Sequence, residues 1–225
     1  YNAATQADAY YWRGESNYRL EDYRAAARDL RKYLELTTHR RSMEYGLALY
    51  NLGYTDFKQK NYPSALNWFN RFLAEGTHPN RQVLADAYNR IGDCHFYARN
   101  FEGARQSYDK ARQADPTFRD YSLYQEAFVK GLQRDYAGKV QTLNVLITNY
   151  PQSQYLDDAL YEQGRAFVQM ENNASAIERY QMLVRNFPQS HMARRAANEI
   201  GLLYYQDDKY PEAIAAYKSV IHNYP

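Results

Sequence analysis

The sequence predicts an all-α fold, a solenoid of about six tandem helix pairs. Among the aliphatic residues, 28 Ala and 19 Leu far outnumber 6 Ile and 7 Val. Ala and Leu favour helices, whereas the β-branched residues favour strands. The 7 Pro and 10 Gly are few and nearly evenly spaced, as turns between helices of similar length require. The third observation is an internal repeat that runs along the chain.

A small residue recurs at intervals of 39, 39, 35, 37 and 37 residues and serves as the anchor of each copy of the repeat. The six anchors are Gly14, Gly53, Gly92, Ala127, Gly164 and Gly201. The copies divide residues 1–225, predicted to be a single superhelical domain, at approximately 7–41, 42–80, 81–118, 119–153, 154–190 and 191–225.

Each copy predicts a first helix with the anchor near its middle, a polar turn, and a second helix. The turns are Glu21-Asp22, Lys60-Asn61, Arg99-Asn100, Arg134-Asp135, Asn172-Asn173 and Asp208-Lys209. Mostly apolar residues follow each anchor after twelve, sixteen and nineteen positions, which places them on one face of the second helix. Pro116, Pro151, Pro188 and Pro225 end the last four copies. Ser153 and Ser190 are expected to cap the helices that follow them.

This pattern resembles the tetratricopeptide repeat family. The matching motifs are Leu49-Tyr50-Asn51-Leu52-Gly53 with Ala65-Leu66-Asn67-Trp68-Phe69, and Gly201-Leu202-Leu203-Tyr204 with Ala213-Ile214-Ala215-Ala216-Tyr217. The resemblance covers almost the whole chain. The fourth copy departs from it, because Ala127 and Lys139 replace the usual Gly and Ala, and Gly131 lies in its first helix.

The long period and the junctions Tyr150-Pro151-Gln152-Ser153 and Phe187-Pro188-Gln189-Ser190 are similar to bacterial envelope proteins of this family. Outer-membrane-assembly lipoproteins and periplasmic coordinators of the Tol-Pal system are examples. This resemblance implies a periplasmic or outer-membrane-associated location, with the cytoplasm as the alternative. The sequence starts at Tyr1 and stops at Pro225, where the pattern is expected to continue. We therefore expect it to be a fragment of a longer protein.

The resemblance also implies that the first helices line a concave groove. We predict that a partner contacts groove residues at set offsets from the anchors: Tyr11, Tyr50, Asn51, Tyr54, Asn89, Asp93, Tyr124, Phe128, Tyr161, Arg165 and Asn198. Tyr and Asn combine rigid contact area with adaptable hydrogen bonding. Tyr dominates the position where the family's grip on a C-terminal carboxylate needs a cation, so that mode is not expected. Packing of the Tyr rings between repeats is the alternative interpretation.

Composition argues against other classes of function. A net charge of +2 disfavours a nucleic-acid binder, and no apolar run is long enough for membrane insertion. The single Cys94 allows no internal disulfide, and the five His have no helical ligand spacing. Asp93, Cys94 and His95 are adjacent on a helix, so they cannot converge on one ion. The sequence contains no phosphate-binding loop or nucleophile elbow, and we expect neither a metal nor a cofactor.

The sequence therefore predicts a non-enzymatic scaffold that binds a protein or peptide segment, in bacterial envelope assembly. Two alternatives stay open: a periplasmic solenoid that binds glycan or peptidoglycan, and a regulatory module of a larger enzyme. Exposed, stacked Tyr rings would favour glycan, and an apolar trough with Asn at its rim would favour peptide. Uncovered terminal repeats predict end-to-end self-association.

Overall fold

The computed structural model describes residues 3–224, which form twelve α-helices, one short 3-10 helix and no strand. The predicted all-α fold of repeated helix pairs is confirmed. The chain divides into two compact units, residues 1–122 and residues 123–225, and each is described by itself. One continuous domain over the whole chain stays a prediction.

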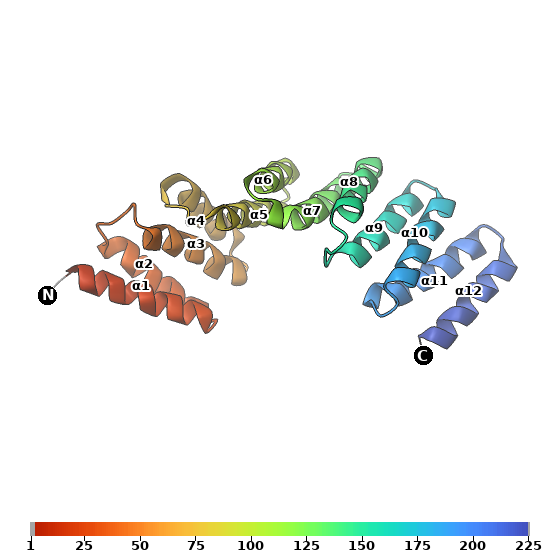
Figure 1. The fold of residues 1–225 in the computed structure, drawn as a ribbon, viewed down its shortest axis with the longest axis horizontal. Coiled ribbons are helices and arrows are strands. Elements are labelled where there is room, and N and C mark those ends of the chain that lie inside the picture. The colour runs from red at the N-terminus through yellow and green to blue at the C-terminus, as the bar shows by residue number, and fades with distance from the viewer. Residues whose placement is uncertain (1–2, 225) are drawn as a thin grey trace. The chain divides into compact units, whose positions relative to one another are not determined.

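Helices follow one another in pairs along the chain (Figure 1). The helices that lie in the first unit are α1 (Ala3–Arg19), α2 (Tyr23–Leu36), α3 (Met43–Lys58), α4 (Tyr62–Glu75), α5 (Arg81–Tyr97), α6 (Phe101–Ala114) and η1 (Pro116–Phe118). Helix α7 (Arg119–Leu132) begins in the first unit and continues into the second. The remaining helices are α8 (Tyr136–Asn149), α9 (Leu156–Gln169), α10 (Asn173–Asn186), α11 (His191–Gln206) and α12 (Tyr210–Asn223).

The anchor residues mark the closest approach of the two helices in a pair. A Cβ atom added at Gly53 would lie 2.6 Å from the ring of Phe69, and one at Gly164 would lie 2.3 Å from the ring of Tyr180. The same clash would occur at Gly14, Gly92 and Gly201, each with the residue sixteen positions later. In the fourth pair that residue is Leu143, and the anchor is Ala127 in the same core cluster. The anchor is therefore glycine where an aromatic ring or Leu30 packs directly against the backbone of the first helix. It is alanine in the fourth pair, where there is space for a methyl group.

The turns within the pairs share one backbone geometry. Seven residues after each anchor, a residue that is not glycine adopts a positive φ of 57–63°: Glu21, Lys60, Arg99, Arg134, Glu171 and Asp208. In the first turn the amide of Asp22 donates to Asn17 O, and that of Glu21 donates to Tyr18 O. These two bonds define a Schellman motif, which satisfies carbonyl groups at the end of a helix. In the fifth pair the turn is Glu171-Asn172, one residue earlier than predicted, because Asn172 caps α10.

Of the two serines predicted to cap helices, one does so and the other does not. Ser190 is the N-cap of α11, where its Oγ accepts from the amide of Met192 at 3.1 Å, as predicted. The prediction for Ser153 is wrong, because α9 begins at Leu156 and its N-cap is Tyr155. Ser153 Oγ instead accepts from the amide of Tyr155 at 3.2 Å. Its side chain therefore stabilises the turn that precedes the helix.

We predict that Gly53→Ala destabilises the protein by about 1–3 kcal/mol, since the new methyl group would overlap the Phe69 ring. The double variant Gly53→Ala/Phe69→Leu reproduces the Ala–Leu combination of the fourth pair. Its loss of stability should be smaller than the sum of the two single losses by about 1 kcal/mol. Urea unfolding of the four proteins, followed by circular dichroism, measures this difference. Strict additivity of the two substitutions would contradict the close-approach explanation.

Candidate functional site

The eleven predicted groove residues differ widely in exposure. Tyr11 and Tyr161 are buried, with 4 % and 5 % of their surface exposed, and Asn89 is fully buried. Asn51 and Asp93 are also buried, and Tyr50, Tyr54, Tyr124 and Phe128 are half-buried. Only Arg165 and Asn198 are largely exposed. The role of the eleven residues as partner contacts stays a prediction. The buried ones cannot contact a partner directly and can act only by positioning neighbouring side chains.

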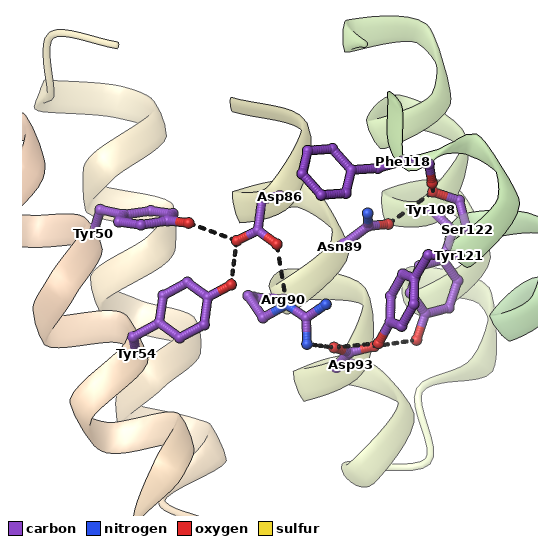
Figure 2. A network of polar contacts seen from close by, with 10 residues as sticks. All are labelled: Tyr50, Tyr54, Asp86, Asn89, Arg90, Asp93, Tyr108, Phe118, Tyr121 and Ser122. Atoms are coloured by element: carbon purple, nitrogen blue, oxygen red, sulfur yellow. Dashed lines mark hydrogen bonds and ion pairs between the residues drawn. The ribbon is translucent and has the colours of Figure 1, made fainter. Parts of the chain in front are cut away.

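In the first unit, three of the predicted residues, Tyr50, Tyr54 and Asp93, take part in one polar network that is centred on α5 (Figure 2). Tyr50 and Tyr54 of α3 both donate their hydroxyls to Asp86 Oδ2, and the Tyr50 bond is 2.6 Å long. Burial and the charge of Asp86 raise the pKa of both hydroxyls, so they remain protonated donors. Arg90 Nε lies 3.7 Å from the other oxygen of Asp86. These contacts hold side chains of α3 and α5, the first helices of two neighbouring pairs, in fixed positions relative to each other.

The same network continues to Asp93, one turn further along α5. Arg90 Nη1 lies 2.7 Å from Asp93 Oδ2. The hydroxyls of Tyr108 and Tyr121 donate to Asp93 at 2.9 Å (Figure 2). Burial raises the pKa of Asp93, while Arg90 and the two hydroxyls act in the opposite direction. The guanidinium of Arg90 also lies 4.9 Å from the centre of the Tyr121 ring, which suits a cation–π contact.

This network is a preformed, partly exposed polar surface. The side chains of Asp86 and Arg90 keep 14 % and 17 % of their surface exposed. Asp86 and Asp93 share the single guanidinium of Arg90, so the three side chains carry one net negative charge. Asn89 holds the start of α7 against α5, since its Oδ1 lies 2.8 Å from Ser122 Oγ. Such rigidity lowers the entropy that a binding surface loses when a partner docks.

The second unit contains a pocket of about 280 Å³ between α7, α8 and α9. Two predicted groove residues, Phe128 and Arg165, line it. The other lining residues are Gly131, Leu132, Tyr136, Lys139, Glu162, Ala166 and Gln169. Gly131 leaves room for the long side chain of Lys139, because a Cβ at this position would lie 3.1 Å from Lys139 Cδ. The pocket therefore depends on Gly131 and Lys139, two of the three residues by which the fourth repeat departs from its pattern.

The pocket has a buried ion pair in its wall. Lys139 donates to Glu162, and both residues are only 7 % exposed. Arg165 Nη1 donates to the second oxygen of Glu162 at 3.0 Å, and the charge of Glu162 raises the pKa of Arg165. Lys139 Nζ also lies 5.6 Å from the centre of the Phe128 ring. Two cations share one carboxylate, which leaves one net positive charge at the pocket.

Comparison with known sequences identifies the repeat. A sequence profile of the tetratricopeptide repeat matches residues 13–80 and 161–225. Two further profiles of this repeat match residues 85–118 and 121–153. The chain belongs to the tetratricopeptide repeat family. Comparison with curated protein sequences gives no match.

Solved structures of tetratricopeptide repeat proteins share the fold at low sequence identity. The C-terminal part of such a protein from Cytophaga hutchinsonii has a TM-score of 0.78 at 13 % identity, covering 95 % of this chain and 78 % of that one. One from Parabacteroides merdae has a TM-score of 0.73 at 14 % identity, covering 97 % and 80 %. YrrB, described as a TPR protein with an unusual peptide-binding site, has a TM-score of 0.64 at 17 % identity, covering 81 % and 87 %.

Sequence reasoning missed several members of both surfaces. Arg90 and Glu162 lie two residues before their anchors, on the predicted groove face, but were not among the selected contacts. Lys139 and Gly131 were recognised as departures from the repeat, and that irregularity is the signal for the pocket. Asp86 carries no sequence signal of its own, since its role depends on the hydroxyls of Tyr50 and Tyr54 on another helix.

Other kinds of site find little support among the described residues. Within residues 3–224, no three His, Cys, Asp or Glu side chains gather as metal ligands do. None of the helices that the structure describes is long and apolar enough to cross a membrane. Cys94 is 1 % exposed, and burial raises the pKa of its thiol to about 12. A thiol in this environment is a weak nucleophile at neutral pH.

We predict that Asp93→Asn destabilises the protein by about 3 kcal/mol, because it leaves the guanidinium of Arg90 without its nearest buried partner. Asp109→Asn is the matched control. It breaks another Arg–Asp pair with three-residue spacing, but Asp109 is 53 % exposed, so the loss should stay within about 0.5 kcal/mol. Chemical denaturation gives both values. Equal losses in the two variants would show that the network around Asp93 does not stabilise the first unit.

Proposed function

We propose that this chain is a non-enzymatic scaffold that binds a segment of a partner protein, with the pocket between α7, α8 and α9 as its anchoring site. The pocket is the observation that carries the proposal. It joins apolar side chains, Phe128, Leu132 and Tyr136, to the charged group of Lys139 and Glu162. Polar groups held in fixed positions beside apolar side chains give a site its specificity.

The charge of the pocket selects the partner's chemistry. Lys139 and Arg165 share the single carboxylate of Glu162, so a second carboxylate can approach Arg165, which is exposed. An acidic side chain next to an apolar residue fits this combination, because the apolar residue can cover Phe128 and Leu132. Charge-assisted hydrogen bonds of this kind are stronger than neutral ones. The proposed ligand is therefore an acidic, partly apolar polypeptide segment.

Two further lines of argument support a polypeptide ligand. Tetratricopeptide repeat proteins generally act as protein-interaction modules, and the similar structure of YrrB has a peptide-binding site by its description. Two of the groove tyrosines, Tyr50 and Tyr54, also differ from a sugar-stacking platform, although Tyr124 stacks on Tyr155 at an interplanar angle of 12°. Tyr50 and Tyr54 meet at an interplanar angle of 61° with their hydroxyls held by Asp86. Rings fixed edge to face present less flat area to a glycan than exposed, stacked rings.

We also propose a bacterial cell envelope as the site of action, in the periplasm or at the outer membrane. The support is the long repeat period and the junctions around Pro151 and Pro188. Fractionation of cells that produce the full-length protein tests this. Recovery in the periplasmic or outer-membrane fraction would support the proposal, and recovery in the cytosol would contradict it.

The binding site is tested with peptides selected from a displayed library on the wild-type protein. We expect the selected peptides to contain Asp or Glu beside an apolar residue, and their affinity to fall as salt increases. Gln169→Trp fills the pocket from its rim and should weaken binding about tenfold or more. Gln141→Trp adds the same ring at an exposed position of α8 outside the pocket and should leave affinity unchanged. Uncharged or basic peptides, or equal affinity in both variants, would overturn the proposal.

A further inference from the structure

The second unit contains a further groove, of about 330 Å³, which the three helices α10, α11 and α12 line. On α12 the lining residues are Glu212, Ala215, Ala216 and Ser219. Ala216 lies fifteen positions after the anchor Gly201. The helices that enclose the groove are all described by the structure, so the groove does not arise from a missing neighbour.

The position of Ala216 is filled or buried in the four preceding pairs. Trp68 and Arg179 stand there in the second and fifth pairs, and both of these large side chains are half-buried. Ser107 and Thr142, in the third and fourth pairs, are smaller but only 7 % exposed. Ala216 is the smallest of these residues and is half-buried. Its small side chain therefore leaves the groove of the last pair open.

The groove around Trp68 in the first unit shows which side chain fits such a space. The Trp68 ring packs against both core clusters of this unit, which contain Leu49 and Leu52. Its Nε1 donates to Asp56 Oδ2 at 3.0 Å. The open groove has an equivalent apolar lining without a ring. Counted from the anchors, Leu34, Leu49 and Leu52 around Trp68 correspond to Val184, Ala197 and Ile200.

The charged groups around the two grooves differ. The guanidinium groups of Arg31 and Arg71 lie 6.0 and 4.9 Å from the centre of the Trp68 ring. Neutral residues stand at both equivalent positions of the open groove. Among its described lining residues Glu212 alone is charged, and this exposed carboxylate makes no ion pair within residues 3–224. A ligand that supplies both a ring and a cation would complete the arrangement that the chain forms around Trp68.

We propose that the groove between α10, α11 and α12 binds a partner polypeptide through an aromatic side chain that has Lys or Arg beside it. The ring occupies the space over Ala216, as the Trp68 ring does in its own groove, and the cation pairs with Glu212. Such charge complementarity selects between ligands. The inference goes beyond the proposed function, because this groove is separate from the pocket between α7, α8 and α9 and selects a basic segment.

The probe for this groove is the capped dipeptide N-acetyl-Trp-Lys-amide. Its binding to the complete 225-residue protein is followed by the NMR signals of the Val184 and Ile200 methyl groups, which line the groove. We expect saturable shifts of both signals. N-acetyl-Ala-Lys-amide, which lacks the ring, should bind at least about tenfold more weakly. N-acetyl-Trp-Glu-amide should bind about two- to fivefold more weakly, because its charge is repelled by Glu212.

Protein variants locate the binding site. Ala216→Trp places in the groove the residue that the chain carries at the equivalent position of α4, so the fold should tolerate it, and binding should weaken about tenfold or more. Ala174→Trp adds the same ring at an exposed position of α10 outside the groove and should bind like wild type. Glu212→Gln should remove the preference for the Lys dipeptide over the Glu dipeptide. Circular dichroism checks the fold of each variant.

Four results would overturn the proposal. The first is no saturable shift of the Val184 and Ile200 signals with the Trp-Lys dipeptide. The second is equal affinity in wild type and Ala216→Trp. The third is equal affinity of wild type for the Lys and Glu dipeptides. The fourth is a concentration-dependent shift of the same signals in the protein alone that Trp12→Ala removes, since the exposed Trp12 of a second copy would then fill the groove.

Discussion

The close approach of the two helices within each pair is the constraint on which the rest of the structure depends. A residue with little or no side chain lies in the middle of the first helix, and a large residue sixteen positions later packs directly on it. The size of one residue determines what the other can be: Gly92 faces Tyr108, whereas Ala127 faces Leu143. This match fixes how deeply each second helix packs, and so which residues of the first helix remain available at the surface.

The proposed binding site arises where one pair departs from this regular packing. Five of the six second helices carry Ala twelve positions after the anchor, and the fourth carries Lys139. A buried ammonium group is costly unless it is paired, and Glu162 supplies the partner. Gly131 provides the space that the longer side chain needs. In the fourth repeat a charged pocket thereby replaces the regular apolar packing of the other pairs. Departures from a regular sequence pattern are expected at functional sites.

The fold could be predicted from the sequence because its signals are periodic. Six copies place Leu30, Phe69 and their equivalents on the buried face of each second helix, and five of the six are fully buried or nearly so. The turn at Asn172 was misplaced by one residue because two adjacent asparagines are equally suited to it. The binding surfaces were harder to predict, since they depend on contacts between helices. Tyr50 meets Asp86, 36 residues away, and Tyr161 points into the core, which its position in the repeat does not reveal.

Photo-crosslinking tests most directly whether the pocket between α7, α8 and α9 binds the partner. Equivalent positions in the other repeats serve as controls. A photoreactive residue is placed, one at a time, five positions after each anchor, at Arg19, Lys58, Tyr97, Leu132, Gln169 and Gln206, all of which are exposed. Only Leu132 and Gln169 line the pocket. We predict that crosslinks to the partner in living cells concentrate at these two positions. Crosslinks of equal yield at all six, or concentrated at the other four, would contradict the account.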